Sequence, residues 1–311
     1  MTFSHSNSYS EGDILEIVAR VFAAPGDSRL RVGIGDDAAV VAGFAQQVIT
    51  TDVAVEDVHF SRRWSNPFDI GRKATAANIA DVLAMGAKPE YLVVALTLTG
   101  DEELGRIEEL AKGIKFEADQ TGALVVGGDV ARGKVISIAI TAIGSVEHPI
   151  LRSGAKAGDG IYISSLPGWS AAGLHLLTND VEATHAVSAM ALNEFRAPSL
   201  DYGVNFKSAH ALCDTSDALL ISAQSISQAS GVAFHLDRSA IESAYEFKEL
   251  ALLAQSVGVD VFDWVLGGGE DHVFLATGID LSGIRIGDVK EGSGVHGIEM
   301  KKAPKIWRHF Q

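Results

Sequence analysis

The sequence lacks the features of disulfide-bonded and membrane-spanning proteins. Its 311 residues include a single cysteine, Cys213, so neither an intramolecular disulfide nor a multi-thiolate zinc site can form. It has no run of about eighteen apolar residues, as a membrane-spanning helix would need. The first residues, MTFSHSNSYS, lack the basic and apolar segments of a signal peptide. We therefore expect a cytoplasmic protein in which residues 1–10 form a loose tail.

Positive charge is also scarce. Lys and Arg number 25 against 40 Asp and Glu, which gives a formal net charge of -15. Such a chain repels phosphate backbones and anionic lipid, so we expect neither a nucleic-acid partner nor a membrane partner. The acidic side chains must instead be solvated or bound to cations.

Apolar residues are plentiful, at 47% of the chain, and the length suits two cores of about 150 residues each. The strand pattern of the first half ends near residues 147–149, where a charged loop, LRSGAKAGD, precedes a new strand. We predict an N-terminal domain of residues 1–148 and a C-terminal domain of residues 149–311.

Helical and strand patterns are mixed along the chain, which predicts an α+β protein. One helix, from Asp69 until Gly86, has alanines at helical spacing that form a slim packing face. Other helices are predicted at about 11–23, 101–122, 170–178 and 216–229, and strands at 91–98, 124–126 and 135–143.

Carboxylates recur at five positions that we place at turns or at the ends of elements. They are Asp36-Asp37, Thr51-Asp52, Asp81, Gly128-Asp129 and Asp214-x-x-Asp217. A helix cap or an Asx turn explains any one of them without a ligand. Two carboxylates 4 Å apart, however, repel by roughly 4 kcal/mol at an effective dielectric constant of 20, so several in one pocket require cations. Carboxylate and hydroxyl oxygens are the ligands that Mg²⁺ prefers.

Two motifs imitate nucleotide-binding loops and fail on chemistry. Gly33-x-Gly35-x-x-Ala38 resembles a dinucleotide fingerprint, but Asp36 and Asp37 would face a pyrophosphate anion. The segment from Gly128 to Lys134 resembles a P-loop, but it precedes a strand, and Val135 replaces the Ser or Thr that binds Mg²⁺.

Taken in order, eight segments resemble the thiamine-monophosphate kinase family, within the superfamily of aminoimidazole ribonucleotide synthetase. They are GIGDDAAVV, TTDVAVEDVHF, GRKATAANIADVLAMGA, GGDVARG, LRSGAKAGD, DTSDALL, GGGEDH and IWRHF, and they span nearly the whole chain. The resemblance implies an N-terminal α+β domain whose sheet forms a homodimer, and a C-terminal α/β domain that closes the active-site cleft. It also implies ATP-dependent phosphorylation of thiamine monophosphate to thiamine diphosphate with several Mg²⁺ ions.

The resemblance also implies roles for individual residues. The metal ligands, direct or through water, would be Asp37, Thr50, Thr51, Asp52, Asp81, Asp129, Asp214 and Asp217. Of these, Asp52, Asp129 and Asp217 would be the catalytic residues. ATP would contact Gly128, Asp129, Arg152 and Ser216, and the thiamine substrate would contact His59, Glu270 and Trp307.

Some of these roles have simpler alternatives. His59 and Arg152 could be ordinary surface residues, and Trp307 could anchor the tail in the core. Two residues depart from the family pattern: Ala218 stands where the family has Gly, and His272 stands where it has Tyr.

Other functions remain open at this point. They are another ATP-using enzyme of the same superfamily and a non-catalytic acidic metal-binding protein.

Overall fold

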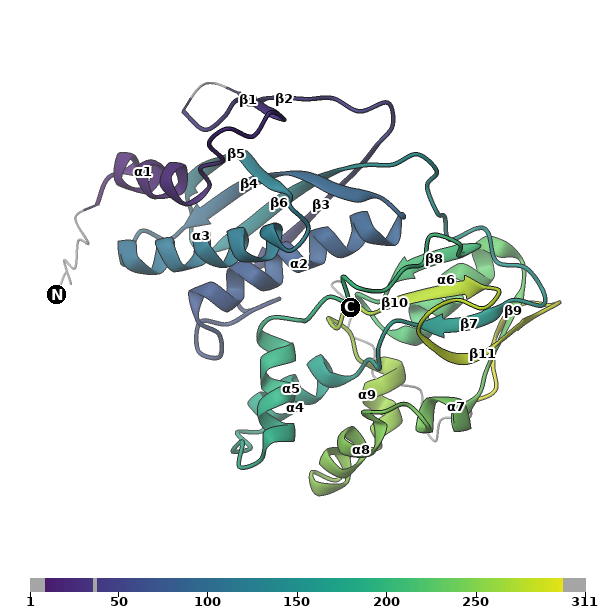
Figure 1. Ribbon diagram of the computed structural model, residues 1–311. Helices are drawn as coiled ribbons and strands as arrows, with labels where there is room; N and C mark the ends of the chain where they lie inside the picture. Colours follow the sequence, from purple (N-terminus) through teal and green to yellow (C-terminus); the bar gives the residue numbers. More distant parts are fainter. Residues whose placement is uncertain (1–8, 36–37, 299–311) are drawn as a thin grey trace. The chain divides into compact units, whose positions relative to one another are not determined.

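The computed structural model describes residues 9–35 and 38–298, and Figure 1 labels its elements. Local signals place the first helix, α1 (Glu11–Val21). The Ser10 hydroxyl accepts from the Asp13 backbone N–H, and the Asp13 carboxylate accepts from the Ser10 backbone N–H. The chain forms two units, one of residues 1–83 with 87–147, the other of residues 84–86 with 148–311. Each is described by itself.

The first unit is built on a four-stranded sheet in the order β3-β6-β4-β5. Its strands are β3 (Gln47–Val55), β4 (Lys88–Leu98), β5 (Leu124–Arg132) and β6 (Ser137–Ser145). Only the β4–β5 pair is parallel, because α3 connects those two strands. Two short strands, β1 (Leu30–Val32) and β2 (Val40–Val41), form a separate antiparallel pair.

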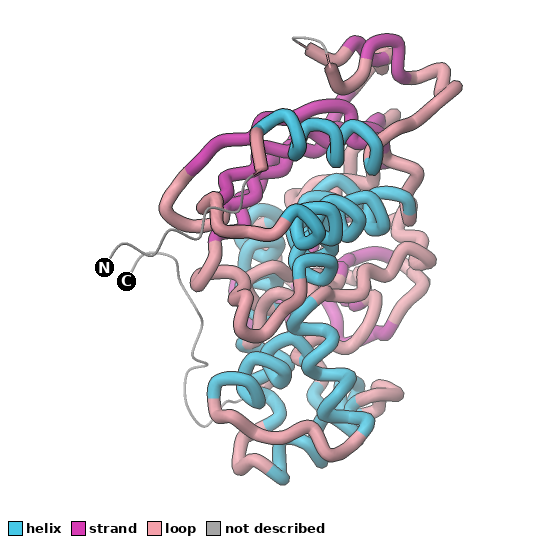
Figure 2. Tube along the Cα trace, turned by 90° about the vertical axis from the view of Figure 1, so that its left-hand side faces the viewer, coloured by secondary structure: helices cyan, strands magenta, loops and turns pink. Residues whose placement is uncertain are grey.

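Helices cover one face of this sheet. Along β6, Ile138, Ile140 and Ala142 are fully buried, whereas the residues between them are partly exposed. Helices α2 (Pro67–Ala84) and α3 (Leu104–Asp119) lie across the buried face, and the turned view shows the same arrangement (Figure 2). The predicted alternation of Ile136, Ile138 and Ile140 is confirmed, and the other face of the sheet is left open.

The two helices on the sheet cross at glycines. A Cβ added to Gly71 of α2 would lie 2.3 Å from the carbonyl oxygen of Leu110, and one added to Gly113 of α3 would lie 2.0 Å from that of Phe68. The backbones therefore touch, as a face of small residues allows. The predicted small-residue face of α2 is confirmed, since Ala74, Ala80 and Ala84 are buried.

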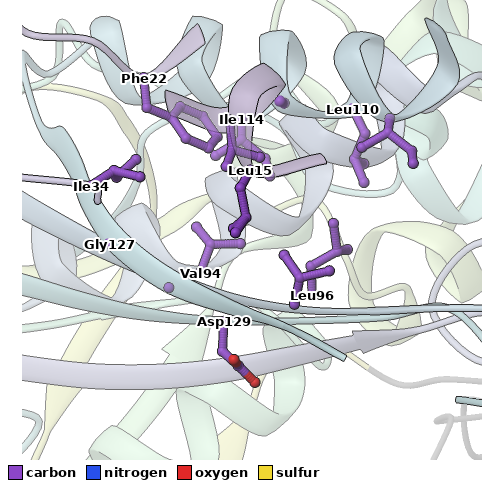
Figure 3. Close-up of a pocket in the computed structure, with 14 residues that line it drawn as sticks. Leu15, Phe22, Ile34, Val94, Leu96, Leu110, Ile114, Gly127 and Asp129 are labelled. Carbon is purple, nitrogen blue, oxygen red and sulfur yellow. The ribbon is translucent and has the colours of Figure 1, made fainter. Parts of the chain in front are cut away.

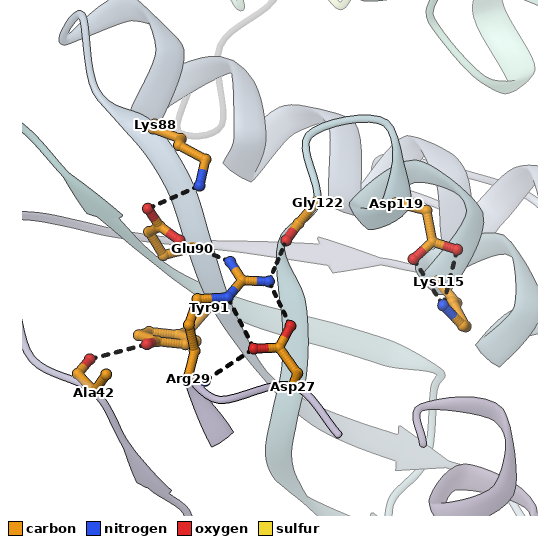
Figure 4. Close-up of polar contacts among 9 residues, drawn as sticks. All are labelled: Asp27, Arg29, Ala42, Lys88, Glu90, Tyr91, Lys115, Asp119 and Gly122. Atoms are coloured by element: carbon orange, nitrogen blue, oxygen red, sulfur yellow. Dashed lines mark hydrogen bonds and ion pairs between the residues drawn. The ribbon is translucent and has the colours of Figure 1, made fainter. Parts of the chain in front are cut away.

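A polar network ties β4 to the segment before β1 (Figure 4). The Arg29 guanidinium donates to Asp27 and, at 2.7 Å, to Glu90 Oε2. Burial raises the pKa of Glu90, but hydrogen bonds from Arg29, Lys88 and Ser145 together hold that pKa below its usual value. The buried carboxylate is thus kept ionised and paired, as burial of a charge requires.

The second unit contains a six-stranded sheet in the order β12-β9-β11-β7-β10-β8. Its strands are β7 (Gly160–Ile163), β8 (Ala211–Asp214), β9 (Ala233–Leu236), β10 (Phe274–Gly278), β11 (Ile284–Lys290) and β12 (Gly294–His296). Its helices are α4 (Trp169–Thr178), α5 (Ala186–Arg196), α6 (Leu219–Ser230), α7 (Arg238–Glu242), α8 (Phe247–Ser256) and α9 (Val261–Gly267). Helix α6 ends at Gly231, whose left-handed φ of 66° is typical of a glycine C-cap.

Both units mix helices and strands, so the predicted fold class is confirmed. Cys213 is buried in the core of the second unit, as predicted. Among the helices of the described residues, none is both long and apolar enough to cross a bilayer.

Candidate active site

Thr50, Thr51 and Asp52 lie in the middle of β3, and the prediction that they form a turn is wrong. Two β-branched threonines followed by Val53 favour extended backbone, and β3 pairs along its whole length with β6. The Thr50 hydroxyl donates to Asp81 Oδ2 of α2 at 2.7 Å. The structure therefore brings two of the predicted metal ligands together on the helix-covered face.

Asn78 of α2 fixes the backbone of Asp52. Its side-chain oxygen accepts from the Asp52 backbone N–H at 3.0 Å, and its amide donates to the carbonyl of Ala74. Because β3 is an edge strand, this N–H has no strand partner on its outer side. This role of Asn78 was not predicted from the sequence. The one signal there was an amide residue three positions before Asp81 on an alanine-rich helix.

Thr51 projects to the opposite, open face of the sheet, as alternation along a strand requires. Its hydroxyl donates to the carbonyl of Ile140 at 3.0 Å and accepts from the Thr141 hydroxyl at 3.2 Å. Thr51 is thus separated by the sheet from the Thr50–Asp81 pair.

Gly128 and Asp129 lie inside β5, so the prediction that this pair stands at a strand end is also wrong. A bulge at Val126 shifts the register, after which Gly128 pairs with Val94 and Asp129 with Ala95. A Cβ on Gly128 would lie 1.9 Å from the carbonyl oxygen of Val94, so only glycine fits there. β5 and β3 are the two outer strands of the sheet, and β6 and β4 separate Asp129 from Asp52.

An apolar cavity of about 70 Å³ lies above Gly127 and Gly128. Figure 3 shows that its walls come from α1, α3 and the helix-covered face of β4 and β5, whereas the Asp129 carboxylate points away from the apolar side chains. Its lining includes Leu15, Phe22, Val94, Leu96, Leu110 and Ile114.

His59 follows β3 in a turn where Asp57 has a φ of 62°. Its Nδ1 accepts the backbone N–H of Val55 at 3.1 Å. Because Nδ1 accepts, the Nε2 atom carries the ring proton. The imidazole is half-buried and held in one orientation.

In the second unit, β8 and β10 are antiparallel neighbours, so the end of β8 and the start of β10 lie at the same edge. Asp214 ends β8 and the loop after it carries Ser216 and Asp217, whereas the loop before β10 carries Glu270 to His272. The Glu270 backbone N–H donates to the carbonyl of Ser216 at 2.7 Å. The topology thus brings the predicted residues Asp214, Ser216 and Glu270 together.

The other predicted residues of this unit that the structure describes lie near the end of β8. Ser216 and Asp217 are exposed, whereas Asp214 is buried. Ala218 has a φ of -175°, which is extended backbone that alanine adopts without strain. Arg152 lies beside the same strand, because the Leu212 backbone N–H donates to the carbonyl of Leu151.

The donor atoms of both units are chemically suited to Mg²⁺, since all are carboxylate or hydroxyl oxygens. The Thr215 hydroxyl, next to Asp214, is buried with no hydrogen-bond partner within the described part of the chain. Among residues 9–35 and 38–298, no three His, Cys, Asp or Glu side chains lie close enough to hold a metal on their own. Asp37 and Trp307 lie outside the described residues.

Comparison with known proteins identifies relatives of this chain. Residues 35–146 match the family model of AIR synthase related protein, N-terminal domain. The thiamine-monophosphate kinase of Mycobacterium tuberculosis is 39% identical, over 79% of this chain and 74% of the relative. That of Corynebacterium glutamicum is 34% identical over 100% of both chains.

A solved structure, AaThiL complexed with AMPPCP and TMP, resembles the whole fold. The TM-score is 0.78 at 30% identity, and the match covers 96% of this chain and 97% of the other. The expected fold, related to AIR synthase, is confirmed.

Proposed function

Because this chain belongs to the thiamine-monophosphate kinase family, we propose that it transfers the γ-phosphoryl group of ATP to thiamine monophosphate. The products are thiamine diphosphate and ADP. The observation that carries this conclusion is the likeness along the whole chain to AaThiL complexed with AMPPCP and TMP.

The reaction needs little covalent chemistry from the protein. A phosphate oxygen of thiamine monophosphate forms a bond to the γ-phosphorus of ATP, and the bond to the β–γ bridging oxygen breaks. The attacking oxygen is largely ionised at neutral pH, because the second pKa of a phosphate monoester is about 6. No general base is therefore required, which agrees with a site rich in Asp. Alignment and charge neutralisation account for most of the catalysis.

We further propose that Mg²⁺ is bound by the acidic side chains of the two units. The residues that would hold it are Asp37, Thr50, Asp52, Asp81, Asp129, Asp214 and Asp217. The Thr51 hydroxyl, also expected as a ligand, lies on the opposite face of the first sheet from Thr50 and Asp81, so it is not placed with them. When bound, Mg²⁺ supplies positive charge that offsets the negative charge of the phosphates. The hydrogen bond from Thr50 to Asp81 and the hydrogen bond from the Asp52 backbone N–H to Asn78 hold Thr50, Asp52 and Asp81 in place before a metal binds.

The nucleotide is proposed to contact Gly128 and Asp129 in the first unit and Arg152 and Ser216 in the second. The Val94 carbonyl of β4 fills the position that a Cβ on Gly128 would take, so glycine is required to keep Gly128 and Asp129 in their places along β5. Arg152 suits a phosphate, since guanidinium binds phosphate in a bidentate manner.

Thiamine monophosphate is proposed to contact His59, Glu270 and Trp307. With Nδ1 occupied by Val55, the Nε2–H of His59 is the atom that would donate to the substrate. The backbone bond of Glu270 to Ser216 fixes the base of its side chain.

Two wider features belong to the same proposal. The open face of the first sheet carries Ile49 and Val53, which are 65% and 48% exposed. Their exposure supports a homodimer formed by this sheet. A cytoplasmic location also stays a prediction, in keeping with the single buried cysteine.

Substituting Asp52 with Asn tests the function at a proposed catalytic residue. We expect thiamine diphosphate formation to fall by about a hundredfold or more, as removal of one electrostatic group typically does. Asp119→Asn, which removes an exposed carboxylate from the end of α3, is the matched control and should retain normal turnover. Near-normal turnover in Asp52→Asn would remove Asp52 from the site.

A further inference from the structure

His272 and Asp214 form a buried pair in the second unit. Nδ1 of His272 lies 3.2 Å from Oδ2 of Asp214, and the two side chains are 4% and 3% exposed. A carboxylate that binds a metal is ionised and can only accept hydrogen bonds, so with Asp214 as a ligand the Nδ1 atom of His272 carries the proton. His272 therefore holds one of the two oxygens of Asp214.

The loop that carries His272 is held at several points. Glu270 and His272 have φ values of 67° and 52°, a left-handed conformation that non-glycine residues seldom adopt. The Asp271 carboxylate accepts the backbone N–H groups of Gly168 and Ser170, each at 2.8 Å, and so caps α4. Such a conformation persists only where its surroundings impose it.

The Asp214 side is fixed as well. The Ser222 hydroxyl donates to the backbone carbonyl of Asp214 at 3.0 Å. A Cβ on Gly269 would lie 2.3 Å from the carbonyl oxygen of Asp217, so the two loops are in close backbone contact. Both partners of the pair thus have little freedom to move apart.

We propose that His272 is a positioning residue, whose Nδ1–H fixes the orientation of the Asp214 carboxylate for binding of the divalent cation. The proposal rests on the proposed function, in which Asp214 is a metal ligand. Hydrogen bonds of this kind to a ligating carboxylate orient it, and their loss typically reduces metal affinity by 10–100-fold.

The test replaces His272 with Asn or Gln, two amides whose side chains differ only in length. The Asn side chain places its N–H₂ group near the position of Nδ1, whereas the Gln side chain places it near Nε2. Binding of Mn²⁺ to the full-length protein with ATP is measured by electron paramagnetic resonance, alongside the KM for Mg²⁺. We expect His272→Asn to retain most of the affinity and His272→Gln to lose about tenfold.

A double-mutant cycle separates positioning from strain at the left-handed position. If His272 acts through Asp214, His272→Gln should have little further effect on Mn²⁺ affinity in an Asp214→Asn background. The proposal would be overturned if His272→Gln lowered Mn²⁺ affinity equally with and without Asp214→Asn. It would also be overturned if His272→Asn and His272→Gln had the same affinity, or if the losses of affinity only followed the fall in melting temperature.

Failure of the proposal and failure of the function give different results. Thiamine diphosphate formed by the wild type, with Mn²⁺ affinity insensitive to Asp214→Asn, rejects the role of His272 but leaves the kinase function intact. Absence of thiamine diphosphate from the wild type rejects the function. Mn²⁺ binding by the variants still decides whether His272 orients Asp214.

Discussion

Asp271 is a buried carboxylate whose surroundings determine both a helix and a pKa. Burial raises its pKa to about 6, and the N–H groups of Ser170 and Gly168 at the start of α4 offset part of that rise. The charged form is therefore tolerated at neutral pH because α4 supplies two donors. The residue is structural, although it lies between Glu270, a proposed substrate contact, and His272.

This shift predicts a pH dependence of stability. With a folded pKa near 6 against an ordinary value of 3.8, the native state binds more protons than the unfolded state in that window. The contribution of Asp271 to the free energy of unfolding must therefore fall as pH rises, by about 1 kcal/mol between pH 5 and pH 7. Denaturant unfolding at both pH values measures it.

Asp271→Asn is the control for that measurement. Its amide has no charge to titrate, so the difference in unfolding free energy between wild type and variant should be more favourable to the wild type at pH 5 than at pH 7. Parallel pH profiles for the two proteins would contradict the assignment. The variant should also be less stable at both pH values, because an amide has a single acceptor oxygen for the two N–H groups.

Single residues were only partly predictable from the sequence. Cys213 and the buried isoleucines of β6 follow from composition and alternation. The partner of His272 does not, because Asp214 lies far away in the chain and is brought near only by the pairing of β8 with β10. Asn78 was missed for the same reason, since its partner is the free edge of a distant strand.

At the scale of elements, the crossing of α2 and α3 depends on glycine. Gly113→Ala would place a methyl group 2.0 Å from the carbonyl oxygen of Phe68, so the helices must move apart. We expect a loss of about 1–3 kcal/mol, as is typical of overpacking. Thermal unfolding monitored by circular dichroism measures it.

Gly105 of the same helix is the matched control. A Cβ added there meets nothing within 4 Å, so Gly105→Ala should leave stability unchanged or raise it by up to about 1 kcal/mol through helix propensity. Similar melting temperatures for the two variants would show that the glycine contact is unimportant.

The elements that sequence patterns placed correctly are those with local signals. The predicted helix from Asp69 to Gly86 has a cap, a helical period and a stop, and the predicted strand at 91–98 is a continuous run of apolar and β-branched residues; both match α2 and β4 closely. The errors concern polar segments inside strands. Gly128 and Asp129 have the composition of a turn, and Asp52 suggested one after two threonines that themselves favour a strand; pairing with β4 and β6 makes both segments strands. That pairing joins residues far apart in the chain, which no local pattern records.

At the scale of the molecule, the open sheet face predicts self-association. Light scattering after size exclusion should give a mass about twice the 32.8 kDa of one chain. Val53→Lys should shift the protein towards monomer, because a charge at the centre of an apolar interface is costly to bury. Leu252→Lys changes an equally exposed apolar residue of α8 and should not alter the mass. A wild-type mass equal to that of one chain would contradict a dimer through this sheet. So would an equal shift in mass caused by Val53→Lys and Leu252→Lys.

The whole-molecule assignment relies on the order of eight short motifs more than on any one of them. Their carboxylates belong to two units and to distant elements, from β3 and α2 to the loop after β8. Their shared chemistry was readable from the sequence, whereas their positions on strands, faces and loops required the structure.

The central claim is direct transfer of the γ-phosphoryl group of ATP to thiamine monophosphate. The most direct measurement incubates the full-length wild type with Mg²⁺, thiamine monophosphate and ATP radiolabelled at the γ-phosphate, and then separates the products. We predict that the label appears in thiamine diphosphate in a one-to-one ratio with ADP. Consumption of ATP with no label in thiamine diphosphate would contradict the account.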